Sequence, residues 1–113
     1  MARKIIKLSF YDKEYTIEYA NRIEVKEYFA KLSELSKAEH TLDNGIKAVV
    51  ILLKAGLIEH HSKEMPSDED VERWATSIPN VKEFYETLLS MVQEVVSLIE
   101  NDTKNLKWEV VQN

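Results

Sequence analysis

The first twenty residues alternate apolar and polar side chains, which is the pattern of a half-buried β-strand. Asp12 lies between two such runs, and aspartate tolerates turn conformations because its side chain bonds nearby backbone groups. The pattern therefore predicts a β-hairpin. Because a lone hairpin is only marginally stable in water, its apolar face must pack on other elements. The apolar positions are Ile6, Leu8 and Phe10 on the first arm and Tyr15, Ile17 and Tyr19 on the second.

From Asn21 onward the apolar positions follow the period of an α-helix. Asn21 and Glu24 form a capping-box-like pair at the start of this helix, and residues 36–40 break it. A second helix is expected to begin at Thr41 or at Asp43. The first apolar stripe is Val25, Tyr28, Phe29, Leu32 and Leu35, and the second is Leu42, Ile46, Val49, Val50, Leu53 and Leu57.

The second helix is apolar nearly all round, since Ile51 and Leu52 lie outside its main stripe. This distribution predicts a central helix. Gly56 could end the helix as a C-cap, but the stripe continues to Leu57, so we expect the helix to run through Gly56. The missing side chain would then allow a neighbouring element to approach closely.

Two further helices follow. Pro66 disfavours helix at the residue before it, and Ser67 with Asp70 forms the N-cap pattern of a short third helix. Asn80 starts a long fourth helix, which is predicted to end near Asn101. The third helix carries Val71, Trp74 and Ile78, with Trp74 expected in the core; the fourth carries Val81, Phe84, Tyr85, Leu88, Met91, Val92, Val95, Val96 and Ile99.

Together these elements predict an α+β fold of order ββαααα, with the N-terminal β-hairpin packed on a bundle of four helices. Residues 1–102 are expected to form a single domain. Residues 103–113 form a C-terminal tail that is either a docked strand or flexible. Leu106, Trp108 and Val110 alternate like a strand, so the tail could add a third strand. The fourth helix should pack on the second through Phe84, Leu88, Val92 and Val95 against Val49, Val50 and Leu53.

Composition narrows the classes of protein. The chain has 113 residues, 44% of them apolar, which suffices for the core of one domain. Its net charge of −5 opposes non-specific binding to nucleic acid. Residues 59–72 are strongly acidic and form either a solvated linker or an acidic recognition surface for a basic partner. The longest apolar run is too short to span a bilayer, the N-terminus does not resemble a signal peptide, and cysteine is absent. We expect a soluble cytoplasmic protein without a membrane or nucleic-acid partner.

Candidate chemistry is sparse. His60 and His61 are adjacent, and neighbouring helical residues point about 100° apart, so they are poorly placed to share one metal ion. We expect them to face solvent near a helix end. The chain has neither a GxSxG sequence nor a glycine-rich phosphate loop, and its carboxylates are explained by helix surfaces and caps. The sequence therefore predicts no enzyme activity, no catalytic residues, no metal and no cofactor.

Four short motifs occur in a recognisable order. They are YDKEYTI at residues 11–17, an amphipathic helix, AGL at residues 55–57, and a helix start at residues 66–71 with the pattern P-S/T-x-E-x-V/I. In this order and spacing, over about residues 5–100, the chain resembles the tail assembly chaperones of siphophages and related prophages of Gram-positive bacteria. It departs from them at Asp12, where glycine is commoner, and it lacks the frameshifted extension that members often carry.

The resemblance implies a non-catalytic chaperone that binds the tape measure protein, keeps it soluble and assists assembly of the tail tube protein, in the cytoplasm of the bacterial host. The alternative is a phage or prophage DNA-associated regulator that acts through helix-mediated DNA binding or dimerisation. A DNA-reading helix should carry several basic residues on one exposed face, and no helix here does so clearly.

A homo-oligomer is also expected, because the apolar positions of the fourth helix extend beyond the arc that one neighbour covers. Related chaperones are thought to form rings or coats around the tape measure protein, so the same face could join copies of this chain. Trp108 has no local stripe and either docks the tail on the domain or contacts a partner. The candidate partner-binding residues are Tyr85, Leu89, Met91, Leu98 and Trp108; Val96 belongs to the same face.

Overall fold

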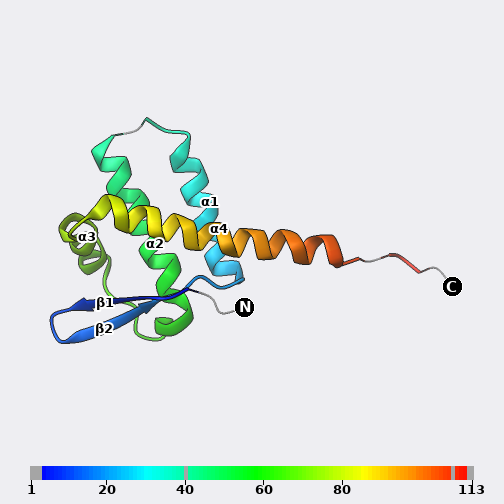
Figure 1. The fold of residues 1–113 in the computed structure, drawn as a ribbon, viewed down its shortest axis with the longest axis horizontal. Helices are drawn as coiled ribbons and strands as arrows, with labels where there is room; N and C mark the ends of the chain where they lie inside the picture. The colour runs from blue at the N-terminus through cyan, green and yellow to red at the C-terminus, as the bar shows by residue number, and fades with distance from the viewer. Residues whose placement is uncertain (1–3, 40, 108, 112–113) are drawn as a thin grey trace.

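The computed structural model has the α+β fold and the ββαααα order that the sequence predicts. The structure describes residues 4–39, 41–107 and 109–111, with the backbone only for residues 101–103. The elements, shown in Figure 1, are β1 (Ile6–Phe10), β2 (Lys13–Ile17), α1 (Ile23–Ser36), α2 (Leu42–His61), α3 (Asp68–Ser77) and α4 (Val81–Asn105).

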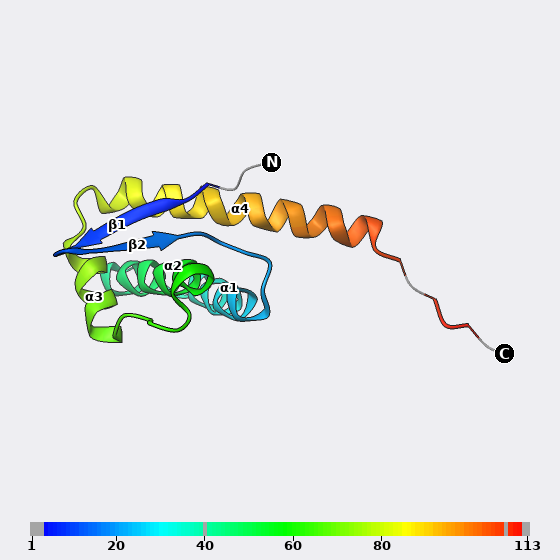
Figure 2. The ribbon, with the colours of Figure 1, turned by 90° about the horizontal axis from the view of Figure 1, so that it is seen from below.

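The helices form two levels. Helices α1 and α2 run antiparallel to each other, with α3 beside α2, and α4 crosses over α1 and α2 (Figure 1). A view turned by 90° separates α4 from the level of the other three helices, and the hairpin lies between the two levels (Figure 2). Helix α2 lies at the centre, as predicted, because it contacts α1, α3 and β2.

The hairpin is antiparallel, with Ile6 opposite Ile17 and Phe10 opposite Lys13, so Tyr11 and Asp12 form the turn. The left-handed backbone conformation falls on Tyr11, with φ of 55°, rather than on Asp12. Phe10 packs edge-on against Trp74, with ring centroids 5.3 Å apart. Trp74 is 4% exposed, which confirms it as a core residue and fixes the apolar face of the hairpin on α3.

Gly56 is the closest contact between the hairpin and the helices. Helix α2 runs through it, as predicted, and the Glu18 N–H donates to the Gly56 carbonyl oxygen at 2.9 Å. A Cβ atom at this position would overlap the Cγ2 methyl of Ile17 and lie 3.4 Å from the ring of Tyr19. The absence of a side chain at Gly56 therefore lets β2 lie directly against α2.

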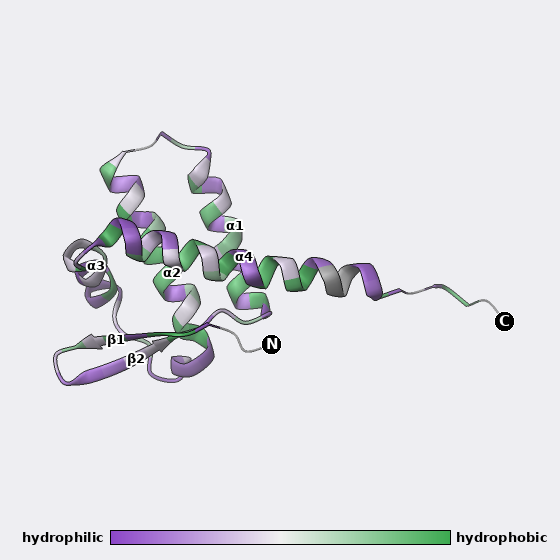
Figure 3. Ribbon diagram, in the orientation of Figure 1, coloured by the Kyte–Doolittle hydropathy of each residue, from purple (hydrophilic) through white to green (hydrophobic). Residues whose placement is uncertain are grey.

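The core joins α2 to α4 and to the hairpin. Leu53 and Leu88 are both fully buried, and Val92 and Val95 belong to the same cluster. The predicted packing of α4 on α2 is consistent with this cluster, in which Phe84 and Val50 are partly buried. Figure 3 shows that the hydrophobic colouring of α4 continues past α1, into the part of the helix that leaves the body of the protein.

Two predicted helix caps are confirmed and one is wrong. The hydroxyl of Thr41 accepts from the Asn44 N–H, and the hydroxyl of Ser67 accepts from the Asp70 N–H, each at 3.1 Å. Asn21 does not cap α1. The N-cap is Arg22, which makes no side-chain cap bond because a guanidinium group has no acceptor; it pairs with Glu59 on α2 instead.

Three further predictions differ from the structure. Leu42 is 82% exposed, because it lies in the first turn of α2, beyond the reach of the core. Helix α4 ends at Asn105 instead of near Asn101, so the predicted domain boundary at residue 102 falls inside it. Among the described residues the sheet has two strands only, and the tail adds no third strand. Trp108 and His40 lie outside the described residues.

Candidate interaction surface

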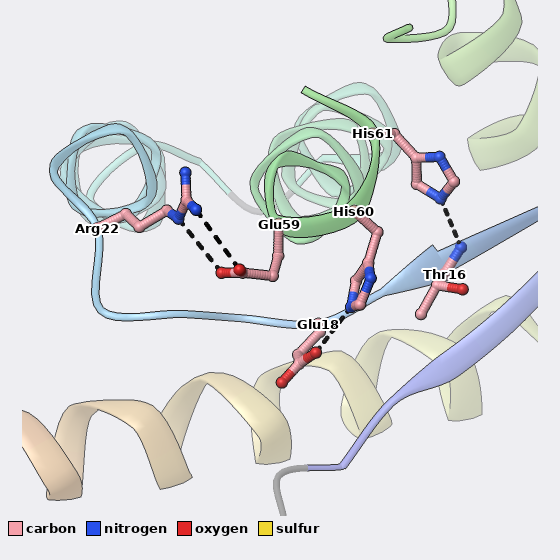
Figure 4. A network of polar contacts seen from close by, with 6 residues as sticks. All are labelled: Thr16, Glu18, Arg22, Glu59, His60 and His61. Carbon is pink, nitrogen blue, oxygen red and sulfur yellow. Dashed lines mark hydrogen bonds and ion pairs between the residues drawn. The ribbon is translucent and has the colours of Figure 1, made fainter. Parts of the chain in front are cut away.

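The C-terminal end of α2 is tied to the segment that enters α1 (Figure 4). Glu59 pairs with Arg22, with 3.3 Å between Oε2 and Nε, and His60 Nε2 lies 2.7 Å from Glu18 Oε1. The Thr16 N–H donates to His61 Nε2 at 2.9 Å, so this nitrogen acts as an acceptor and carries no proton in this contact. The two histidines therefore hold β2 and its continuation on α2. His60 is exposed, as predicted, whereas His61 is half-buried, so the expectation that it faces solvent is wrong.

The other question about His60 and His61 is whether they hold a metal ion. Among the residues that the structure describes, no group of three His, Asp or Glu side chains is placed to hold a metal ion. Of the helices in the described ranges, none combines the length and the apolar character needed to cross a membrane.

The N-terminal end of α2, in contrast, borders an open apolar groove. We call this groove, of about 570 Å³, the α1–α4 groove, because side chains of α1, α2 and α4 line it. Its rim is formed by uncharged polar residues, Ser33, Ser36, Thr41 and Asn44. The apolar lining consists of Phe29, Leu32 and Leu35 from α1, Gly45 and Ala48 from α2, and Tyr85, Leu89, Val92 and Val96 from α4.

A second hollow, of about 450 Å³, lies on the other side of Tyr85, between α2, α3 and the start of α4. It shares Thr41, Gly45 and Tyr85 with the α1–α4 groove. Gly45 therefore lies where two open spaces meet, and a Cβ atom built on it would have no neighbour within 4 Å. Exposed apolar side chains stand nearby, since Leu42 and Val81 line the same hollow.

A third hollow, of about 720 Å³, lies between α1, α2 and α3. Its rim carries charges of both signs, which distinguishes it from the α1–α4 groove. The charged residues are Lys31, Glu34, Asp43, Lys47 and Glu72.

The C-terminal part of α4 leaves the body of the protein. Val95 is still 5% exposed, whereas Val96 and Leu98 are 38% and 41% exposed. The molecule measures 61 × 34 × 24 Å, and its radius of gyration of 16.1 Å exceeds the value of about 13 Å expected for a compact domain of this length. We call residues 96–105 the α4 arm. Figure 1 shows it extending beyond α1, and its first turn still contacts the body, since Val96 lines the α1–α4 groove and Ile99 packs against the core.

The predicted partner-binding residues fall into different places. Tyr85 and Leu89 are partly buried and line the α1–α4 groove, and Leu98 is exposed on the α4 arm. Met91 is 3% exposed and belongs to the core with Leu88, so the prediction that it lies on a free face is wrong. The wide apolar stripe of α4 is covered on this side by the body of the protein.

The open position at Gly45 was missed by sequence reasoning. Gly45 occurs in an otherwise helical pattern, where glycine costs about 1 kcal/mol relative to alanine. The cost indicated that the position is special, since a glycine in the interior of a helix is usually there for a packing reason.

Comparisons of the chain with protein-family models, with curated proteins and with solved structures found no match. The structure itself describes a small α+β protein with uncovered apolar grooves. Surfaces of this kind commonly bind other proteins.

Proposed function

We propose that this chain is a non-catalytic tail assembly chaperone, which binds apolar helical segments of a phage tape measure protein and thereby assists assembly of the tail tube. The α1–α4 groove is the observation that carries the proposal. Three helices present apolar side chains to it, and its rim is polar but uncharged. Such a groove suits the apolar face of an amphipathic helix, whose side chains at i, i+3 and i+4 point the same way.

Electrostatics supports a role in keeping a client in solution. The chain carries a net charge of −5, and net charge of one sign disfavours association between complexes. The rim of the α1–α4 groove adds no charge that would have to be desolvated when a helix enters. An apolar segment could therefore be covered in the groove while the outer surface of the complex stays charged.

The motifs behind the resemblance lie at positions that determine the fold. The YDKEYTI segment forms the turn and β2, Gly56 of the AGL motif is the contact between β2 and α2, and Ser67 caps α3. The resemblance therefore concerns the packing of the hairpin on the helices. The groove is in part a separate argument for binding, because its lining residues on α2 and α4 lie outside these motifs, whereas Phe29, Leu32 and Leu35 belong to the amphipathic helix.

The alternative function, a DNA-associated regulator, has less support from the arrangement of charges. Both arginines described lie within 3.5 Å of carboxylates, Arg22 beside Glu59 and Arg73 beside Glu69. Lys54 pairs with Asp68 at 2.7 Å. These pairs neutralise three of the cations that phosphate binding could use.

Co-expression with the tape measure protein of the same phage or prophage tests the proposal. We expect the two proteins to co-purify, and we expect Gly45→Leu to weaken the interaction by about tenfold or more, because leucine would project into the groove. Ala30→Leu is the matched control, since Ala30 is exposed on α1 and lines none of the three hollows described above. Failure to co-purify, together with salt-sensitive retention of duplex DNA, would support the regulator instead.

A further inference from the structure

The two histidines at the C-terminal end of α2 hold the same segment by contacts that respond to a proton in opposite ways (Figure 4). The Thr16 N–H donates to His61 Nε2 at 2.9 Å, and a backbone N–H can only donate. Nε2 must therefore be unprotonated for this contact to exist. His60 Nε2 lies 2.7 Å from Glu18 Oε1, and this contact becomes an ion pair when His60 is protonated.

The direction of the pH dependence follows from these two contacts. An imidazole ordinarily takes up its second proton near a pH of about 6.5, and both of its nitrogens then donate. His61 therefore loses its acceptor as the pH falls, so its contact with Thr16 is complete above this range and is lost below it. The contact between His60 and Glu18 gains a charge over the same range and becomes stronger.

No other described group replaces the acceptor that His61 loses. The titratable or charged groups that face the two histidines or follow them in the chain are Tyr15 and Glu18 on the hairpin side, Arg22 before α1, Glu59 on α2, and Lys63 and Glu64 after α2. Glu18 faces His60, and Glu59 pairs with Arg22. His61 has no carboxylate partner within the described residues, so a proton on it gains no ion pair there.

Aromatic side chains of the hairpin connect His61 to α3. The ring of Tyr15 lies 5.3 Å from the ring of His61 and 4.9 Å from that of Trp74, and Phe10 packs on Trp74 from the same side of the hairpin. The indole N–H of Trp74 is buried and has no hydrogen-bond partner among the described residues. A buried donor without an acceptor is costly, and water would satisfy it if the hairpin moved away. The closed position on α3 thus carries a cost that opening relieves.

The base of β2 is fixed without His61. Ile17 is fully buried, and the Glu18 N–H donates to the Gly56 carbonyl oxygen at 2.9 Å. A carbonyl oxygen does not titrate in this range, so this bond does not depend on a histidine. We call residues 8–15 the hairpin tip. Thr16 is the last point of β2 that His61 holds, and Ile17 and Glu18 form a hinge behind it.

We propose that His61 is a proton-controlled latch for the hairpin tip. Protonation at Nε2 removes the acceptor of the Thr16 N–H, and the tip lifts from α3. The hinge stays in place, because the bond from Glu18 to Gly56 persists and the contact between Glu18 and His60 becomes stronger.

The latch changes which surface the protein presents. In the neutral form the rings of Phe10, Tyr15 and Trp74 pack on one another, and Trp74 is 4% exposed. In the acid form these rings become accessible and form an aromatic surface on the tip and on α3. The latch is independent of the proposed function, because none of its residues lines the α1–α4 groove.

Hydrogen exchange of two amides in one segment tests the latch on the unaltered protein. We expect the protection of the Thr16 amide, relative to the intrinsic exchange rate at each pH, to fall about tenfold or more between about pH 7.5 and about pH 5.5. The Glu18 amide is the internal control, because its acceptor on Gly56 does not titrate. Unchanged protection at Thr16, or an equal loss at Glu18, would overturn the inference.

The fluorescence of Trp74 reports the position of the tip. Trp108→Phe leaves Trp74 as the only tryptophan, and the emission of this variant should shift to longer wavelength as the pH falls, because water reaches the indole. Adding His61→Gln should abolish the shift, since an amide oxygen can accept from the Thr16 N–H but takes up no proton. His60→Gln is the matched control and should keep the shift. Equal behaviour of the two glutamine variants, or no shift in Trp108→Phe alone, contradicts the latch.

Circular dichroism separates movement of the tip from acid unfolding of the whole chain. The helical signal should stay constant over the pH range of the fluorescence shift, because the four helices remain packed. A helical signal that disappears together with the shift would mean global unfolding and would sink the latch. If His61→Gln failed to fold at neutral pH, the exchange measurement on the unaltered protein would decide alone.

Discussion

The two ends of α2 differ in how completely the rest of the chain covers them. At the C-terminal end, the Gly56 carbonyl accepts from the Glu18 N–H, and His61 accepts from the Thr16 N–H. At the N-terminal end, Leu42 is 82% exposed, and Gly45 borders open space on two sides. One helix thus has one end that is closely covered and one end that is open. A helix at the centre of a fold can therefore be buried at one end and exposed at the other.

We expect the largest difference in stability between two leucine substitutions in α2, one in its buried part and one at its exposed N-terminal end. Leu53 is fully buried in the core, so Leu53→Asp would leave an unpaired charge there and lower the free energy of unfolding by more than about 4 kcal/mol. Leu42→Asp is the control in the same helix and should change the free energy of unfolding by less than about 0.5 kcal/mol. Urea denaturation measures both. Similar midpoints for the two variants would mean that α2 is not buried as described.

Alanine substitutions at the two glycines should change the stability of the protein in opposite directions. Gly56→Ala forces Ile17 aside and should cost about 1–3 kcal/mol of stability. Gly45→Ala meets no neighbour and removes the flexibility of glycine from a helix, so it should add about 0.5–1 kcal/mol. Thermal melting at one protein concentration compares them. If both substitutions destabilised the protein, the space above Gly45 would not be open.

A substitution at Tyr19 should have a smaller effect on stability, and this effect should depend on pH. Its hydroxyl donates to the Leu52 carbonyl oxygen at 2.8 Å, and burial raises the pKa of Tyr19 above its usual value. Folding therefore favours the protonated phenol, so this contribution is complete below the unfolded pKa of about 10 and is lost as the pH rises above it. Tyr19→Phe should cost about 1 kcal/mol at neutral pH.

A titration of stability from pH 8 to 11 checks this assignment. The wild-type protein should lose part of its advantage over Tyr19→Phe as the pH rises above about 10, because only the wild type has the buried hydroxyl to ionise. The other tyrosines are the same in both proteins, so their contributions cancel in the difference. A constant difference across this range would show that the Tyr19 hydroxyl stays accessible to water.

Local signals predicted much of this fold. The alternation of the hairpin, the caps at Thr41 and Ser67, and the passage of α2 through Gly56 each depend on residues close together in the chain. The cap at Asn21 is wrong because α1 begins at Ile23, which makes Arg22 the N-cap, and Arg22 pairs with Glu59 on another helix. A single sequence gives no direct sign of such a distant pair.

The binding surface was harder to predict for a related reason. The width of the apolar stripe on α4 showed that more than one neighbour was needed, but it did not show which side each neighbour would cover. Met91 is therefore buried, while Leu98, on the arm, is exposed. The length of α4 was underestimated, so the arm itself was not anticipated.

The contact between Thr16 and His61 joins residues 45 positions apart, and this has a consequence for the order of events during protein synthesis. The hairpin leaves the ribosome first, but the helix that accepts from the N–H groups of Thr16 and Glu18 follows much later. A two-stranded hairpin is marginal without such cover, and closing a long loop carries an entropic cost. The strands made first therefore become stable only after the end of α2 has been translated, and until then their apolar side chains remain accessible to the chaperones of the cell.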